Sequence, residues 1–197
     1  MTFQVAVVGA GRMGRGITLS YIFAGVPVVL IDLKDRLPEE YEELAESISD
    51  ELTRDLKFLS EIDLISPEDI DGAKSLVSLI DRTEASEKMY DCRIIFEAVP
   101  EVMSLKIEAI KYIDSTSKHE AVVASTTSTF LVNDLAVKSK YPERFLNAHW
   151  LNPAHLIPLV EVSKGDNTSK KATKILVESL EAIGKVPVVC SASAGYI

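Results

Sequence analysis

Apolar residues in the first part of the chain form two short continuous runs separated by an amphipathic stretch. The runs Phe3–Val8 and Pro27–Ile31 are rich in β-branched residues, and Met13–Ala24 between them has apolar positions at helical spacing. Continuous apolar runs of this length are typical of parallel strands buried on both faces. Gly25 comes where a helix over Met13–Ala24 would end. The pattern therefore predicts a strand, a helix and a second strand.

A longer helical pattern follows the second predicted strand. Between Leu37 and about Ile65 the apolar residues recur on one helical face, which is formed by Leu44, Ile48, Leu52, Leu56 and Leu59. The same stretch carries ten Asp or Glu residues, against only Arg54 and Lys57. We expect residues 37–65 to form a helical excursion with a solvated acidic face.

The rest of the chain continues the alternation of strand and helix signals. Strands are predicted at Leu76–Ile80, Arg93–Val99, Ala121–Ala124, Arg144–Trp150, Leu159–Val162 and Val186–Cys190. Helices are predicted at Glu101–Ser115, Val132–Lys138 and Asn167–Ile183. This alternation predicts an α/β fold over residues 1–197, with a doubly wound, mostly parallel sheet and helices on both faces. Such sheets bind ligands at the carboxyl ends of their strands.

Composition narrows the classes of partner. Acidic residues outnumber basic ones by 30 to 21, and the net charge of −9 without a basic patch argues against nucleic-acid or anionic-membrane binding. No apolar run is long enough to span a bilayer and no leader precedes the first strand, so we expect a cytoplasmic protein. Cys92 and Cys190 are isolated and lack the spacing of metal ligands, so no metal site is expected.

A glycine-rich turn joins the first predicted strand to the first helix. The run Gly9-Ala10-Gly11-Arg12-Met13-Gly14 is a G-x-G-x-x-G, and Asp32 ends the second strand. In a Rossmann-type domain Gly9 permits the tight turn, Gly11 lets the backbone approach a pyrophosphate, and Gly14 allows helix–strand packing. The alternative is a glycine turn without a ligand, but the strand–turn–helix context and the acid together favour a dinucleotide site.

The acid at the end of the second strand bears on the choice of dinucleotide. Asp32 would accept a hydrogen bond from a ribose 2′-hydroxyl and would repel a 2′-phosphate, which favours NAD over NADP. Lys34 and Arg36 stand close by in the sequence and leave the NADP alternative open.

A second group of motifs lies in the C-terminal half. The segment from Tyr141 to Pro153 contains P-E-R-x-x-x-x-H-x-x-N-P, and Leu159–Val162 reads L-V-E-V. With Glu97–Glu101, Gly184-Lys185 and the final Gly195-Tyr196-Ile197, the chain resembles over nearly its whole length the NAD-binding domain of the 3-hydroxyacyl-CoA dehydrogenase family, of the 3-hydroxybutyryl-CoA dehydrogenase type.

The resemblance implies a catalytic group. His149 matches the family's general acid/base, Glu161 the carboxylate that orients it, and Ser128 the hydroxyl that holds the reacting oxygen, although Thr127 or Thr129 could supply the same hydroxyl. Oxidation of a secondary alcohol needs a base at the hydroxyl, and a histidine with a pKa near 6.5 serves in both directions at neutral pH. Without the resemblance, a structural histidine and a surface acid would be the simpler interpretation.

The resemblance also implies the cofactor contacts. Asn152 matches a residue beside the nicotinamide, and Glu101 and Lys106 match positions that line the cofactor. The complete set expected to bind NAD is Gly9, Gly11, Arg12, Met13, Gly14, Asp32, Glu101, Lys106, Ser128 and Asn152.

Departures from the family pattern leave the substrate open. The usual S-N-T-S-S is Ser125-Thr126-Thr127-Ser128-Thr129 here, and I-P-L-V-E at Ile157–Glu161 also resembles the branch that oxidises small free hydroxy acids. The acidic excursion is a poor surface for the anionic CoA tail. The leading hypothesis is NAD-dependent interconversion of a 3-hydroxyacyl-CoA and a 3-oxoacyl-CoA, as in fatty acid metabolism. The alternatives are a sugar-acid or carnitine type of dehydrogenase and a non-catalytic NAD-binding module.

The family further has a C-terminal helical domain that closes the substrate cleft and forms much of a dimer. The present sequence stops before the position of that domain, so the resemblance implies a cleft completed beyond Ile197 and a homodimer of the full-length protein.

Overall fold

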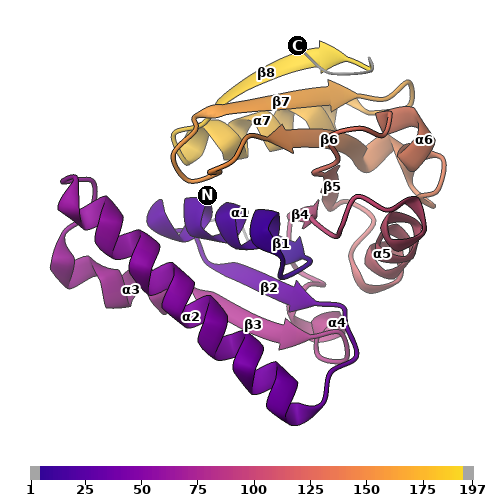
Figure 1. Cartoon of the computed structure of the whole chain (residues 1–197). Helices are drawn as coiled ribbons and strands as arrows, with labels where there is room; N and C mark the ends of the chain where they lie inside the picture. Colours follow the sequence, from indigo (N-terminus) through magenta and orange to yellow (C-terminus); the bar gives the residue numbers. More distant parts are fainter. Residues whose placement is uncertain (1–4, 193–197) are drawn as a thin grey trace.

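A single eight-stranded sheet organises the chain. A computed structural model describes residues 5–192, in which the strands follow the order β3-β2-β1-β4-β5-β6-β7-β8 (Figure 1). The strands are β1 Val5–Val8, β2 Val28–Asp32, β3 Val77–Asp81, β4 Ile94–Glu97, β5 Val122–Ser125, β6 Phe145–Trp150, β7 Leu159–Lys164 and β8 Val186–Ser191. The α-helices are α1 Arg12–Phe23, α2 Pro38–Glu61, α3 Ile70–Lys74, α4 Ala85–Lys88, α5 Met103–Thr116, α6 Val132–Ala136 and α7 Lys170–Ala182. Short 3-10 turns occupy Pro67–Asp69 and Pro142–Arg144.

The pairing of the strands is parallel except at one place. Every neighbouring pair from β3 to β6 is parallel, β7 runs antiparallel to β6, and β8 is again parallel to β7. Strand β1 pairs with β2 on one side and β4 on the other, so the order of the sheet reverses there. Such a reversal opens a crevice at the carboxyl ends of the strands, which is where open α/β sheets bind ligands.

Side chains of β1 alternate between two hydrophobic cores. Val5 and Val7 belong to a cluster with residues of α1, α2 and α7, whereas Ala6 and Val8 belong to a cluster with residues of α4, α5 and α6. All four are at most 1% exposed, because helices cover both faces of the sheet. This arrangement confirms the predicted doubly wound α/β fold, and the continuous apolar runs in the sequence are its direct consequence.

The helical excursion leaves the sheet between β2 and β3. Helix α2 has 24 residues, and its buried residues are the predicted apolar face of Leu44, Ile48, Leu52, Leu56 and Leu59. Arg15 of α1 connects the two helices: it donates hydrogen bonds to the Glu51 carboxylate at 2.5 Å and to the Ser47 hydroxyl at 3.1 Å, both on α2. Within residues 5–192, no helix combines the length and the apolar character needed to cross a membrane.

Most predicted elements are present within a few residues of the expected bounds. Helix α1 ends at Phe23, and Gly25 has φ +76°, which a residue with a side chain rarely adopts. The sequence did not predict α4, because four residues are too few to establish a helical period. The final Gly195-Tyr196-Ile197 of the family resemblance lies outside the described residues.

Candidate active site

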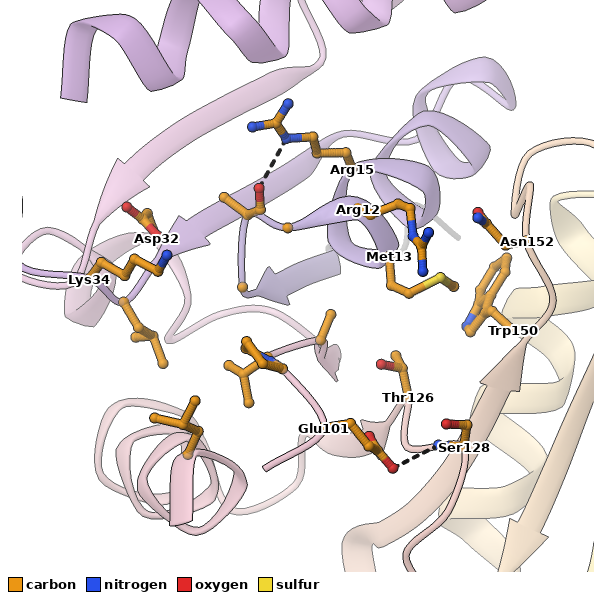
Figure 2. Close-up of a pocket in the computed structure, with 18 of the residues that line it drawn as sticks. Arg12, Met13, Arg15, Asp32, Lys34, Glu101, Thr126, Ser128, Trp150 and Asn152 are labelled. Atoms are coloured by element: carbon orange, nitrogen blue, oxygen red, sulfur yellow. Dashed lines mark hydrogen bonds between the residues drawn. The ribbon is translucent and has the colours of Figure 1, made fainter. Parts of the chain in front are cut away.

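A cavity of about 780 Å³ lies along the carboxyl ends of the parallel strands (Figure 2). Its walls come from the β1–α1 turn, the residues after β2, the β4–α5 turn, the polar run after β5 and the end of β6 with the loop that follows. The volume is within the range of cofactor and ligand sites, roughly 300–1,000 Å³. These five segments, which are distant in sequence, therefore meet in one site together with Leu44 of α2.

The three glycines of the β1–α1 turn differ in what surrounds them. Gly9 has φ +115°, and a Cβ there would lie 2.6 Å from the Ala98 carbonyl oxygen. A Cβ on Gly14 would lie 1.8 Å from the Gly9 carbonyl oxygen, whereas a Cβ on Gly11 would meet no atom within 4 Å. The fold itself requires the first and last glycines. Gly11 instead leaves open space above the N-terminus of α1.

That open space suits the pyrophosphate of a dinucleotide. Helix α1 begins at Arg12 with Gly11 as its N-cap, and both residues line the cavity together with Met13. The N–H groups of a first helical turn have no partner within the helix and carry partial positive charge, so they favour a phosphate. Gly9, Gly11, Arg12 and Met13 therefore lie together at the cavity, whereas Gly14, which was also predicted to bind the cofactor, does not line it.

Asp32 lines the cavity at the carboxyl end of β2. It is 4% exposed, and its carboxylate accepts a hydrogen bond from Nε of Arg36. Lys34 and Arg36 line the same part of the cavity, and Figure 2 shows the Lys34 side chain beside Asp32. The sequence indicated that these cations were near but not that one of them is paired to the acid.

Lys106 does not line the cavity, although the resemblance placed it at the cofactor. Its side chain is fully buried, and its Nζ donates to the two carboxylate oxygens of Glu97 at 3.1 and 3.2 Å and lies 3.3 Å from Oε2 of Glu101. The Ser125 hydroxyl donates to Glu97 at 2.5 Å. Burial raises the pKa of Glu97, and the charge of Lys106 and the hydrogen bond from Ser125 act against that rise. The positive charge of Lys106 is thus compensated by the buried Glu97 and by Glu101, which lines the cavity.

Glu101 fixes the polar run that follows β5. Its Oε1 accepts hydrogen bonds from the Thr127 hydroxyl at 2.5 Å and the Thr129 hydroxyl at 2.7 Å, and from the backbone N–H groups of Ser128 at 3.1 Å and Thr129 at 3.0 Å. Both threonine hydroxyls are therefore engaged by Glu101. Ser128 and Thr126 line the cavity, whereas Thr127 and Thr129 do not, which supports Ser128 over Thr127 and Thr129 as the substrate ligand.

The hydrogen bonds to Glu101 predict a pH-dependent contribution to stability. Burial raises the pKa of Glu101, but the hydroxyls of Thr127 and Thr129 and the charge of Lys106 outweigh it and lower the pKa from 4.5 to about 2. A carboxyl group whose pKa is lowered by folding stabilises the folded chain above its unfolded pKa and loses that effect as the pH falls through the folded value. Glu101→Gln should therefore lower the unfolding free energy at neutral pH.

Denaturant unfolding of both proteins as a function of pH checks this expectation. The difference between wild type and Glu101→Gln should be constant above about pH 4.5 and shrink between that pH and about 2. Glu46→Gln on the exposed face of α2 is the control and should leave stability unchanged. A difference that stayed constant down to pH 2 would show that the carboxylate charge is not what matters.

His149 and Glu161 are directly opposite one another on β6 and β7. The two residues are register partners in the antiparallel pair, and Nδ1 of His149 lies 2.6 Å from Oε2 of Glu161. The Glu161 side chain is 6% exposed and that of His149 is 19% exposed, and His149 lines the cavity. The geometry brings together the two side chains that the sequence analysis had matched with an acid/base and its orienting carboxylate.

A buried lysine holds the loop that carries Asn152. Asn152 follows β6 and lines the cavity. Nζ of Lys185 donates to the carbonyl oxygens of Ala154 at 2.7 Å and Ile157 at 3.1 Å, and it lies 5.7 Å from the centre of the Trp150 ring. Burial lowers the pKa of Lys185 to about 8. Sequence analysis found this lysine only as part of a Gly-Lys match, because its partners are backbone groups of a loop some thirty residues earlier.

The sheet, the glycine turn and the acid that ends β2 define a dinucleotide-binding Rossmann domain. Among known families, that of the 3-hydroxyacyl-CoA dehydrogenase NAD binding domain matches residues 4–193. The chain belongs to this family, which confirms the resemblance drawn from its motifs and identifies NAD as the cofactor of the domain.

Individual relatives agree with this assignment. The chain is 29% identical over 194 residues to a probable 3-hydroxybutyryl-CoA dehydrogenase of Deinococcus radiodurans, which covers 98% of the chain and 66% of the relative. The crystal structure of (S)-3-hydroxybutyryl-CoA dehydrogenase PaaH1 from Ralstonia eutropha has a TM-score of 0.87 at 25% identity, over 100% of this chain and 66% of that one. An NAD+-dependent dismutase, 5-formyl-3-hydroxy-2-methylpyridine 4-carboxylic acid 5-dehydrogenase, has a TM-score of 0.81 at 27% identity, over 100% and 60%. The chain thus spans slightly less than two thirds of these relatives.

Proposed function

We propose that the full-length protein is an NAD-dependent oxidoreductase that interconverts a 3-hydroxyacyl-CoA and a 3-oxoacyl-CoA. The observation that carries this proposal is the 2.6 Å contact between His149 and Glu161, at a cavity that also contains the glycine turn and Asp32. An acid/base pair beside a dinucleotide site is what a hydroxyl oxidation requires. The names of the relatives from Deinococcus radiodurans and Ralstonia eutropha support the acyl-CoA substrate class.

The residues of the cavity fit NAD along its length. The turn from Gly9 to Gly14, with Arg12 and Met13, would hold the pyrophosphate, and Asp32 would accept a hydrogen bond from the adenosine ribose. Figure 2 shows Asn152 and Ser128 on the side of the cavity away from Asp32, where the nicotinamide would be. Glu101 borders the cavity, and the buried Lys106 would act through it as a positioning residue. When bound, NAD supplies the acceptor for the hydride.

Proton transfer falls to His149. With Nδ1–H donated to Glu161, the neutral ring presents Nε2 as the basic nitrogen, and this nitrogen would take the proton of the substrate hydroxyl. The imidazolium formed in that step is stabilised by the Glu161 carboxylate, and it returns the proton when a 3-oxo group is reduced. The Ser128 hydroxyl would hold the reacting oxygen by a hydrogen bond.

An NADH absorbance assay on the full-length protein tests the proposal. With acetoacetyl-CoA as the substrate, NADH should be consumed, and kcat/KM should exceed that for free acetoacetate at least about tenfold, a difference of about 1.4 kcal/mol in transition-state stabilisation. If neither acetoacetyl-CoA nor acetoacetate supported NADH consumption, the assignment of the reaction class would be contradicted.

A second candidate is a dehydrogenase of a small free hydroxy acid, such as a sugar acid or carnitine. Two observations favour it: the similarity to the pyridine carboxylic acid dehydrogenase, and the ten acidic residues between Glu39 and Asp63, which would repel the phosphates of CoA. A higher kcat/KM with free acids than with CoA thioesters would support this candidate. The third possibility, a non-catalytic NAD-binding module, has no use for the His149–Glu161 pair. The homodimer, the cytoplasmic location and the role in fatty acid metabolism stay predictions.

A further inference from the structure

Three side chains with charge surround the end of the cavity where the adenosine ribose would lie. Asp32 has a side chain that is 6% exposed, and it is ion-paired through one carboxylate oxygen, Oδ2, with Nε of Arg36. The Arg36 side chain is 23% exposed and also lines the cavity, as does Lys34. Figure 2 shows Lys34 and Asp32 side by side at that end of the cavity.

The backbone fixes Arg36 at this position. Asp32 ends β2 and Pro38 begins α2, so Arg36 lies in a connection of five residues between two regular elements. The N–H of Leu37, the N-cap of α2, donates to the Glu40 carboxylate at 3.0 Å, which holds the start of the helix. Loss of the Asp32 carboxylate would therefore leave the Arg36 side chain at the rim of the cavity without its ion-pair partner.

Arginine and lysine are the side chains that recognise a ribose 2′-phosphate. A guanidinium binds a phosphate through two parallel hydrogen bonds, and a lysine adds a point charge. In the wild-type chain the Arg36 charge is engaged by Asp32, whose own charge repels a phosphate. The same ion pair leaves Oδ1 of Asp32 to accept a hydrogen bond from the 2′-hydroxyl of NAD.

We propose that Arg36 is a latent ligand for a 2′-phosphate and that its ion pair with Asp32 determines the cofactor specificity of this domain. The pair makes the cavity select NAD(H), and removal of Asp32 alone converts it to an NADP(H) site by releasing Arg36 beside Lys34. This inference rests on the proposed dinucleotide site and deepens it, because it assigns the choice of cofactor to one arginine outside the glycine motif.

Fluorescence titration of the full-length protein with NADH and with NADPH tests the proposal in four variants. The wild type should bind NADH at least about tenfold more tightly than NADPH. Asp32→Ala should reverse the order, with NADPH bound at least about tenfold more tightly than NADH. Arg36→Ala should widen the wild-type preference for NADH, because the charge of Asp32 is then uncompensated.

The double variant Asp32→Ala/Arg36→Ala separates recognition by Arg36 from simple relief of repulsion. Both variants lack the Asp32 carboxylate, so its repulsion of the phosphate is removed equally in both. If Arg36 binds the phosphate, the double variant should bind NADPH at least about tenfold more weakly than Asp32→Ala. Asp32→Asn, which keeps the shape of the side chain, serves as a second test should Asp32→Ala fold poorly, and it should also prefer NADPH.

Several results would overturn the inference. A double variant that kept the NADPH affinity of Asp32→Ala would exclude Arg36 as the ligand, and so would single variants at Asp32 that bind NADPH no better than the wild type. A wild type that bound neither dinucleotide would instead contradict the proposed function, so the two failures are distinguishable.

Discussion

Replacement of His149 by alanine should lower kcat about a hundredfold or more, while the affinity for NADH stays nearly unchanged. In the proposed function the imidazole moves the substrate proton, and its Nδ1 lies 2.6 Å from Oε2 of Glu161. The glycine turn and Asp32, which would bind most of the cofactor, are on other strands and do not depend on this side chain. Steady-state kinetics and NADH titration of the same full-length protein measure the two effects separately.

Two further variants sharpen this prediction. Glu161→Gln should cause a smaller loss of kcat than His149→Ala, because the amide oxygen still accepts a hydrogen bond from Nδ1 but carries no charge to stabilise the imidazolium. His119→Ala is the matched control, since the His119 side chain is 56% exposed and lies outside the cavity. Normal turnover by His149→Ala would refute its assignment as the acid/base.

Gly14→Ala should lower the stability of the fold, whereas Gly11→Ala should leave the fold stable and weaken NADH binding. A Cβ at Gly14 would lie 1.8 Å from the Gly9 carbonyl oxygen, and a backbone atom in a tight turn cannot give way. Gly14→Ala should therefore cost about 3 kcal/mol or more of unfolding free energy, or prevent folding. A Cβ at Gly11 meets no atom within 4 Å, and its φ of −82° and ψ of −174° suit any residue. Gly11→Ala should cost no more than about 1 kcal/mol.

The same pair of variants also separates folding from cofactor binding. In Gly11→Ala the new methyl group occupies the space above the N-terminus of α1, so NADH affinity should fall at least about tenfold in a protein that is still folded. Urea unfolding gives the stability and fluorescence titration gives the affinity. Unchanged NADH binding by Gly11→Ala would show that the pyrophosphate does not lie above this turn.

The sequence by itself indicated most of the strands and helices, the glycine turn after β1 and the acid that ends β2. Strands buried on both faces must be apolar throughout, so Val5–Val8 and Ile94–Glu97 could be found without knowledge of their neighbours. The turn after β1 needs particular glycines for local reasons of backbone geometry, and its residues are adjacent in the chain. Such features depend on contacts within one strand–turn–helix unit, which is why their spacing carries the information.

Only the tertiary structure decided which distant side chains meet. His149 and Glu161 were matched to their roles through a family pattern, but their contact depends on the antiparallel register of β6 with β7. The burial of Lys106 beneath the cavity and the pairing of Arg36 with Asp32 have no periodic signature, because each depends on where one long, flexible side chain finds an opposite charge. Periodicity records whether a position faces the core or the solvent; the partner of a charged group is selected by distance and desolvation once the chain has folded.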